Sequence, residues 1–221
     1  MGNVLTPTQK TAKAQRIAAA AGKLFQTHAF SDISMTMIAQ RADVAKGTLF
    51  NYYQTKENIF MTLLLEGYQN YFRQLITWLA AKSALTPAQL KAYLLAETQA
   101  LITQHTTLVR LNALRGPVLE AHADRSQTAA GRRDLYAVNR RLGETLADKL
   151  PGLDAQTAAH LFVVQSAIIS GFMNLAGLDH FNHTALAADF PAFQINLERE
   201  ACQTFGFYLD GIFKEELFYE S

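Results

Sequence analysis

The sequence is poor in the residues that stabilise secreted proteins and that build metal or redox centres. It contains a single cysteine, Cys202, among 221 residues. One thiol excludes an intramolecular disulfide framework and cannot by itself form a metal site, which fits a reducing compartment. The amino terminus also has no basic segment followed by an apolar run, so no secretory signal is expected. Both absences favour a cytoplasmic protein.

Long uninterrupted apolar runs are missing as well. The longest apolar stretch, "LFVVQSAIISGFMNLAGL" at residues 161–178, is interrupted by four polar side chains, namely Gln165, Ser166, Ser170 and Asn174. This pattern favours a buried helix over a lipid-facing one, and no membrane is expected among the partners.

Patterns that carry catalysis are also absent. The chain has no Gly-x-Ser-x-Gly elbow, no phosphate-binding glycine loop and no His-Glu-x-x-His helix, and its carboxylates are scattered. The segment "DHFNH" at residues 179–183 has a spacing loosely similar to metal sites, but no cysteine or second cluster completes it. We therefore expect no catalytic residue, no metal, no cofactor and no enzymatic activity.

The formal net charge of +1 hides an asymmetry along the chain. Residues 1–60 contain seven Lys or Arg against three Asp or Glu, a net charge of +4, whereas the remaining 161 residues contain thirteen against sixteen, a net charge of −3. A basic first quarter on a mildly acidic body is consistent with one end that meets a polyanion.

Apolar residues recur at spacings of three and four along nearly the whole chain, and no sustained alternation appears. This pattern predicts an all-α fold of about nine helices without strands. Cap residues mark several starts, because Thr6 and Thr86 each precede a proline and a glutamine, and Ser34, Thr55 and Asp154 stand before apolar runs. The predicted helices span residues 7–28, 34–42, 45–53, 55–80, 86–104, 107–114, 125–150, 154–178 and 190–217, with a break at Gly116 and Pro117.

The segment "AKGTLFNYYQTKENIF", residues 45–60, sets aromatic residues beside lysines at the end of two short helices. Two short helices that follow a longer amphipathic one form a helix-turn-helix arrangement. Leu49 and Tyr53 should pack onto Ile38 and Phe25, which leaves the opposite face of the second short helix open for the major groove of DNA. A glycine at the start of this helix, Gly47, lets the backbone approach base edges closely.

The segment "ISMTMIAQRADVAKGTLFNYYQTKENIF" resembles the signature of TetR-type (TetR/AcrR) transcriptional regulators, and the resemblance covers about residues 10–62. It implies that double-stranded operator DNA is a partner and that Lys56 binds a phosphate. The residues that the resemblance places toward the groove are Thr36, Lys46, Gly47, Thr48, Phe50, Asn51 and Tyr52.

The sequence departs from the family pattern at three positions. Asp43 stands where glycine is common, Ala45 replaces a frequent serine or threonine cap, and Tyr53 replaces phenylalanine. Asp43 can adopt the turn and could also cap the second short helix. The loss of a hydroxyl at Ala45 removes a plausible phosphate contact.

For the rest of the chain, the resemblance implies a helical domain that binds an effector and forms a dimer. We expect a DNA-binding domain at residues 1–54 and an effector-binding and dimerisation domain at residues 55–221, with the helix from Thr55 as a connection between them. The helices at 154–178 and 190–217 are rich in small and apolar residues, which predicts a homodimer interface, although an ordinary intrachain core accounts for any single residue equally well.

An effector pocket is expected between the helices of residues 86–175, for an unidentified small molecule. Polar residues in apolar surroundings are candidates to orient it, namely His105, Arg110, Asn112, Asn139, Gln165 and Asn174. The resemblance favours a ligand-responsive repressor that binds a near-palindromic operator as a dimer. The alternative is an all-helical carrier or adaptor of small molecules without DNA binding, and a helical enzyme comes third.

Overall fold

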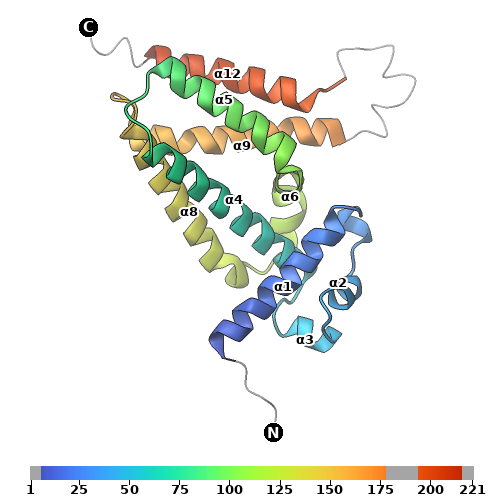
Figure 1. Cartoon of the computed structure of the whole chain (residues 1–221). Helices are drawn as coiled ribbons and strands as arrows, with labels where there is room; N and C mark the ends of the chain where they lie inside the picture. The colour runs from blue at the N-terminus through green and yellow to red at the C-terminus, as the bar shows by residue number, and fades with distance from the viewer. Residues whose placement is uncertain (1–5, 178–193, 216–221) are drawn as a thin grey trace. The chain divides into compact units, whose positions relative to one another are not determined.

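The computed structural model describes residues 6–177 and 194–215 (Figure 1). Every regular element within these residues is a helix, so the predicted all-α class is confirmed. The α-helices are α1 (Pro7–Phe25), α2 (Met35–Arg41), α3 (Lys46–Phe50), α4 (Lys56–Ala80), α5 (Pro87–Gln104), α6 (Thr106–Leu114), α7 (Glu120–His122), α8 (Arg125–Ala147), α9 (Ala155–Gly177) and α12 (Leu197–Glu215).

The helix starts follow the predicted caps. Thr6 and Thr86 both form full capping boxes, in which the hydroxyl accepts from the backbone of the glutamine three residues later and that glutamine side chain accepts in return. Ser34 Oγ accepts from Met37 N at 3.2 Å, and Asp154 Oδ1 accepts from Gln156 N and Thr157 N at 2.8 and 3.0 Å. Local side-chain chemistry therefore sets where these helices begin.

The predicted break at Gly116 and Pro117 is wrong. The chain continues helically from α6 through a π-helical turn, Arg115–Leu119, into α7. A π turn widens the hydrogen-bonding ring, which gives room to a proline that lacks an N–H. With this stretch counted as one helix, the described residues contain nine α-helices, as predicted.

The last helix also starts later than predicted. Residues 194–196 are not helical, and Asn196 caps α12 by accepting from Arg199 N at 2.9 Å. The other predicted positions before it, residues 190–193, lie outside the described residues.

The chain forms two compact units. The first comprises Met1–Gly67 and Leu114–Arg133, and the second comprises Tyr68–Ala113 and Asp134–Ser221. The division therefore falls inside α4, after Gly67, and inside α8, after Arg133.

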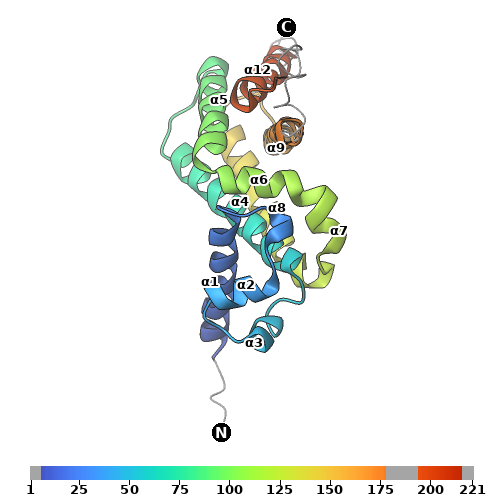
Figure 2. The same cartoon turned by 90° about the vertical axis from the view of Figure 1, so that its right-hand side faces the viewer.

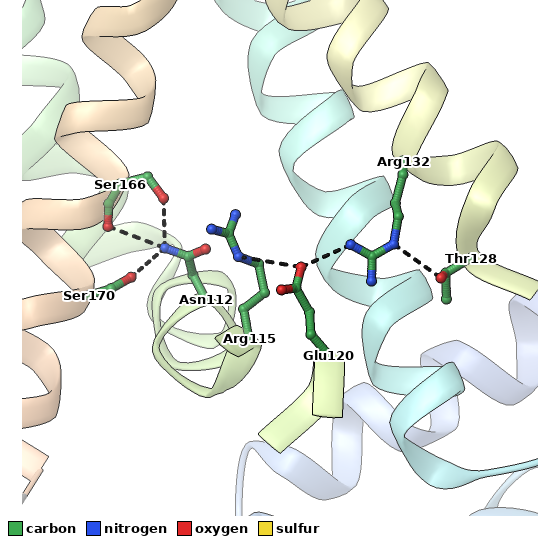
Figure 3. A network of polar contacts seen from close by, with 7 residues as sticks. All are labelled: Asn112, Arg115, Glu120, Thr128, Arg132, Ser166 and Ser170. Atoms are coloured by element: carbon green, nitrogen blue, oxygen red, sulfur yellow. Dashed lines mark hydrogen bonds and ion pairs between the residues drawn. The ribbon is translucent and has the colours of Figure 1, made fainter. Parts of the chain in front are cut away.

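In the first unit, α1 packs against α2 and α2 packs against α3, and Phe60 of α4 is fully buried. Its ring makes edge-on contacts with Phe25 and Phe30, with centroids 5.5 and 5.1 Å apart. The segment 114–133 of this unit contains an ion pair, in which Arg132 donates from Nη1 to Glu120 at 2.9 Å (Figure 3).

In the second unit, α12 packs along both α5 and α9, and the three helices lie side by side (Figures 1 and 2). Leu94 of α5 and Phe205 and Leu209 of α12 are fully buried. α8 approaches α9 closely at Gly143, where a Cβ would come within 2.4 Å of the Ala155 carbonyl oxygen. Close helix packing therefore holds the described part of this unit together.

Candidate functional site

The turn between α2 and α3 determines how α3 is presented. Asp43 has a φ of 52°, in the left-handed region, so it makes the turn as expected. It does not cap α3, because the N-cap is Ala45, two residues later, and Ala45 offers no side-chain hydrogen bond. The uncapped start leaves the first backbone donors of α3 without a side-chain partner from the cap residue.

Two long-range hydrogen bonds hold α3 against α1. Arg16 donates from Nη2 to the Asp43 carbonyl oxygen at 3.4 Å, before α3, and Tyr53 donates from its hydroxyl to the Ala14 carbonyl oxygen at 3.4 Å, after it. Between them, Leu49 is fully buried. The inner face of α3 is therefore fixed on α1 and α2, as the spacing of Leu49 and Tyr53 predicted.

The predicted groove-facing residues lie on α2, on α3 and directly after α3, and none of them is buried. Phe50 is 44% exposed, so its ring is open to contact with a partner. A Cβ added at Gly47 would meet nothing within 4 Å, so the start of α3 is open. The other members are exposed or half-buried, namely Thr36, Lys46, Thr48, Asn51 and Tyr52.

Lys56 is engaged within the first unit. Its ammonium donates to the carbonyl oxygens of Phe30 and Ile33 at 2.8 and 3.0 Å and lies 4.3 Å from the centre of the Phe30 ring. An ammonium has three donors, so one remains for another acceptor. No pattern in the sequence predicted this contact, because the partners lie 23 and 26 residues away.

The first turn of α4 also holds a buried amide that the sequence pattern did not single out. Asn58 is 1% exposed, and its Oδ1 accepts from the Thr55 hydroxyl at 2.7 Å and from Asp124 N at 3.0 Å. Its Nδ2 donates to Gln127 Oε1 at 2.7 Å. Asn58 therefore joins the start of α4 to the loop before α8, and a polar residue one turn into an apolar helix was the available signal.

The predicted effector residues lie in different environments of the second unit. Asn112 and Gln165 are buried, at 5% and 2% exposure, and Asn174 is exposed. His105 ends α5 and packs against the Tyr71 ring, with centroids 5.7 Å apart. Arg110 is half-buried on α6.

Asn112 lies between α6 and α9. Its Nδ2 donates to Ser166 Oγ at 2.8 Å, to the Ser166 carbonyl oxygen at 3.3 Å and to Ser170 Oγ (Figure 3). Gln165 points to another neighbour and donates from Nε2 to Thr98 Oγ1 on α5 at 2.8 Å. The structure thus brings Asn112 together with two serines that stand out in the sequence only because they interrupt the apolar stretch.

Asn139 lies apart from Asn112, on α8. Its Nδ2 donates to the Ala159 carbonyl oxygen at 3.3 Å, and the residue lines an open cleft of about 630 Å³ together with His160, Val163 and Tyr208. The cleft is formed by α8, α9 and α12. Asn139 and Asn112 therefore make their hydrogen bonds to different parts of α9.

No three His, Cys, Asp or Glu side chains within residues 6–177 and 194–215 are arranged to hold a metal ion. The "DHFNH" segment, residues 179–183, lies outside these ranges. Helix α9 is long and apolar enough to cross a membrane, with a mean hydropathy of 1.4 over Ala155–Ala176 and 28% of the window buried. One such helix is weak evidence for a membrane protein, because core helices pass the same test.

The arrangement of α1 to α3, with an anchored inner face and an open outer face, defines a helix-turn-helix protein. Residues 17–63 match the family model of the bacterial regulatory proteins of the tetR family, and residues 65–216 match the tetracyclin repressor-like carboxy-terminal domain. The chain belongs to the TetR family of transcriptional regulators, whose members combine a DNA-binding helix-turn-helix with a ligand-binding domain.

Solved structures show the same fold at low sequence identity. The fatty acid degradation regulator FadR from Bacillus halodurans is 16% identical, with a TM-score of 0.55 over 94% of this chain and 96% of that chain. FadR from Bacillus subtilis, in complex with stearoyl-CoA, is 17% identical, with a TM-score of 0.51 over 86% and 96%. FadR from Thermus thermophilus, a TetR-family repressor in complex with lauroyl-CoA, is 20% identical, with a TM-score of 0.50 over 89% and 92%. No curated protein sequence matches the chain.

Proposed function

We propose that this regulator is a cytoplasmic repressor that binds a near-palindromic operator as a homodimer and leaves it when a small molecule binds the carboxy-terminal domain. The observation that carries the proposal is the open outer face of α3, where an exposed Phe50 and an unobstructed Gly47 surround a fully buried Leu49. A purely structural helix of five residues has no need for an exposed phenylalanine and a glycine at its start.

The DNA contacts are proposed to fall into two classes. Thr48 and Asn51 offer a hydroxyl and an amide to base edges, and Phe50 offers apolar contact to a thymine methyl group. Lys46 and the remaining donor of Lys56 are assigned to phosphates. The resemblance adds Thr36, Gly47 and Tyr52 to the groove-facing set.

The dimer is proposed to form through α9 and α12. Val163 and Phe207 are 52% and 67% exposed, and Cβ atoms added at Gly171 or Gly211 would meet nothing within 4 Å. A dimer interface built on these exposed residues would be an apolar face with small side chains, beside the open cleft that Val163 and Tyr208 line. Two helices of this length present roughly 630 Å² at about 1.5 Å of rise per residue and about 10 Å of width, somewhat below the ~800 Å² that each partner of a standard interface buries.

Such a dimer presents two recognition helices. Half-site centres about 34 to 36 Å apart, or a multiple of this distance, are expected from the helical repeat of DNA. An effector releases DNA to the extent that it binds the DNA-incompetent arrangement more tightly, typically by about 1 to 3 kcal/mol of coupling.

The effector is proposed to bind within the second unit, where the six predicted polar residues lie. Two structural relatives are in complex with stearoyl-CoA and lauroyl-CoA, so a ligand with an extended apolar part is a reasonable first class to test. His105, Arg110, Asn139, Gln165 and Asn174 keep the role of candidates beside Asn112.

The proposal is tested by fluorescence-anisotropy titration of operator DNA and scrambled DNA at several salt concentrations. Lys46→Ala should weaken both DNAs and lower the salt slope by about 0.9 for each phosphate that is no longer neutralised. Asn51→Ala and Thr48→Ala should weaken operator binding more than scrambled binding, by about 1 to 3 kcal/mol for a good base contact. Arg141→Ala, which removes an exposed positive charge from α8 in the second unit, is the matched control and should change neither titration.

Lys56→Ala is a poor phosphate probe, because it also removes the two hydrogen bonds to the Phe30 and Ile33 carbonyls. If Lys46→Ala changes base preference while Asn51→Ala and Thr48→Ala leave it intact, the assigned orientation of α3 is wrong. If the unaltered protein shows no salt-dependent DNA binding at all, the carrier or adaptor function replaces the proposed one.

A further inference from the structure

Asn112 differs from the other candidate effector residues because its hydrogen-bonding capacity is only half used. Its Nδ2 serves three oxygens of Ser166 and Ser170, as Figure 3 shows, but its Oδ1 is buried and accepts no hydrogen bond within the described residues. Buried amide oxygens in proteins nearly always have a partner, so this one calls for an explanation.

The orientation of the amide follows from its surroundings. The Ser166 carbonyl oxygen, 3.3 Å from Nδ2, can only accept a hydrogen bond. A flipped amide would set its oxygen against this carbonyl, so the nitrogen must face the serines and the oxygen must face away. The serine hydroxyls act as acceptors from Asn112, so each keeps a proton to donate.

Gln165 does not share this property, and Asn139 shares it in a different part of the unit. Gln165 donates to Thr98 Oγ1, and Thr98 in turn donates to the Leu94 carbonyl oxygen at 2.7 Å. The Thr98 hydroxyl therefore both accepts and donates a hydrogen bond within the protein. Asn139 also has a buried oxygen without a partner in the described part of the chain, but it lines the cleft beside the face proposed for the dimer. Asn112 is thus the candidate that combines deep burial, an orphan acceptor and two further hydroxyl groups.

We infer that Asn112, Ser166 and Ser170 form the polar end of the effector site, and that the effector is a neutral molecule with a hydroxyl or primary amide group on an apolar body. The role of this molecule as effector rests on the proposed function, but its binding does not depend on it. A hydroxyl or amide can donate to Asn112 Oδ1 and accept from a serine hydroxyl at the same time. An apolar body is inferred because the residues that flank these three in α6 and α9 include the buried apolar side chains Leu111, Phe162 and Ile169.

An anionic head group does not fit this point. A carboxylate or phosphate has no proton for Asn112 Oδ1 and would bring negative charge against it. The hydrogen-bond partners that Asn112 has on α9 are neutral serine oxygens and not a positively charged side chain. Burial of an anion here would be costly without such a partner.

The test uses octanamide and octanoate, which share an apolar chain and differ in the head group, with the full-length protein labelled with ¹⁵N. The side-chain amide resonance of Asn112 is identified by its loss in Asn112→Leu. Octanamide should shift this resonance saturably, and octanoate at pH 7.5 should bind at least about tenfold more weakly, the ratio expected for loss of one hydrogen bond in a buried site.

Asn112→Leu should lower octanamide affinity about tenfold, measured by calorimetry, whereas Asn70→Leu, the same change at an exposed position of α4, should leave it unchanged. Ser170→Ala keeps the amide and should give a smaller loss, which keeps the test decisive if Asn112→Leu does not fold. Equal binding of octanoate, unaltered octanamide affinity in Asn112→Leu and Ser170→Ala, or no saturable shift up to solubility would each overturn the inference.

Operator titrations separate this inference from the proposed function. If Asn112→Leu lowers octanamide affinity but the unaltered protein binds no DNA, the assignment of the site is supported and the proposed regulator function is refuted. If the protein binds its operator but Asn112→Leu leaves octanamide affinity unchanged, the regulator function is supported and the assignment of this site is refuted.

Discussion

The close approach of α8 to α9 gives a sharp test of how the carboxy-terminal domain is packed. At Gly143 in α8, an added Cβ would lie 2.4 Å from the Ala155 carbonyl oxygen, 2.7 Å from Ala159 Cβ and 2.8 Å from Ala159 N. Two of these atoms belong to the backbone of α9, which cannot move aside as a flexible side chain can. We therefore predict that Gly143→Ala forces α8 and α9 apart.

The expected cost combines two opposing effects. Overpacking of this kind costs about 1 to 3 kcal/mol, and we expect the upper end because the added Cβ clashes with backbone atoms. Alanine in place of a helical glycine returns about 1 kcal/mol. The net destabilisation should be about 2 kcal/mol, which lowers the melting temperature by about 4 to 8 °C for a chain of this size.

Gly171→Ala on α9 is the matched comparison, because its added Cβ meets nothing within 4 Å. In a monomer it should raise the melting temperature by about 2 to 4 °C through helix propensity alone.

In the proposed dimer, a bulky Gly171→Leu should instead weaken association, since position 171 then faces the partner. Sedimentation measures association, and a stable monomer of the unaltered protein at micromolar concentration would refute the dimer.

The assay follows unfolding by the fluorescence of Trp78, the chain's only tryptophan, whose ring stacks on that of Tyr93 with centroids 3.7 Å apart. Protein concentration must be held constant, because the apparent stability of a dimer depends on it. A Gly143→Ala protein that melts within about 1 °C of the unaltered one, which corresponds to less than about 0.5 kcal/mol, would refute the close approach of α8 and α9.

Two further predictions concern the first unit. Asn58→Ala should destabilise the protein by about 2 to 3 kcal/mol in urea unfolding, because it leaves the Asp124 N–H without the acceptor it has now. Asn70→Ala, at an exposed position, serves as the control. Equal stability of the two variants would contradict the role of Asn58 as a bridge to Asp124. Burial raises the pKa of the Glu66 carboxyl in the folded state, so its contribution to stability is fully present below the ordinary pKa of 4.5 and is lost as the pH rises through the raised value. Glu66→Gln should therefore match the unaltered protein at low pH and become the more stable of the two toward neutral pH, and a difference that does not change with pH would contradict the burial of this carboxyl.

Much of the architecture could be predicted from the sequence, because helix starts are decided locally. Thr6, Thr86, Ser34 and Asp154 cap the helices that follow them, and their bonds reach only two or three residues along the chain. The helix-turn-helix was recognisable for the same reason, since its turn, its glycine and its buried leucine stand within one short segment. The misplaced ends were at Pro117, where the helix continues through a π turn, and before Asn196, which caps α12.

Other properties were decided only by the tertiary structure, because they depend on residues far apart in the chain. The sequence presents Lys56 as a free cation and Asn112 as one of six polar candidates. The fold brings Lys56 to two carbonyls more than 20 residues away, and it brings Asn112 to two serines more than 50 residues away while its oxygen is left without a partner within the described residues. Gly143 and Gly171 look alike in sequence, yet a Cβ at one would meet backbone and a Cβ at the other would meet nothing. Helical periodicity states which residues share a face, but only packing between helices determines what that face meets.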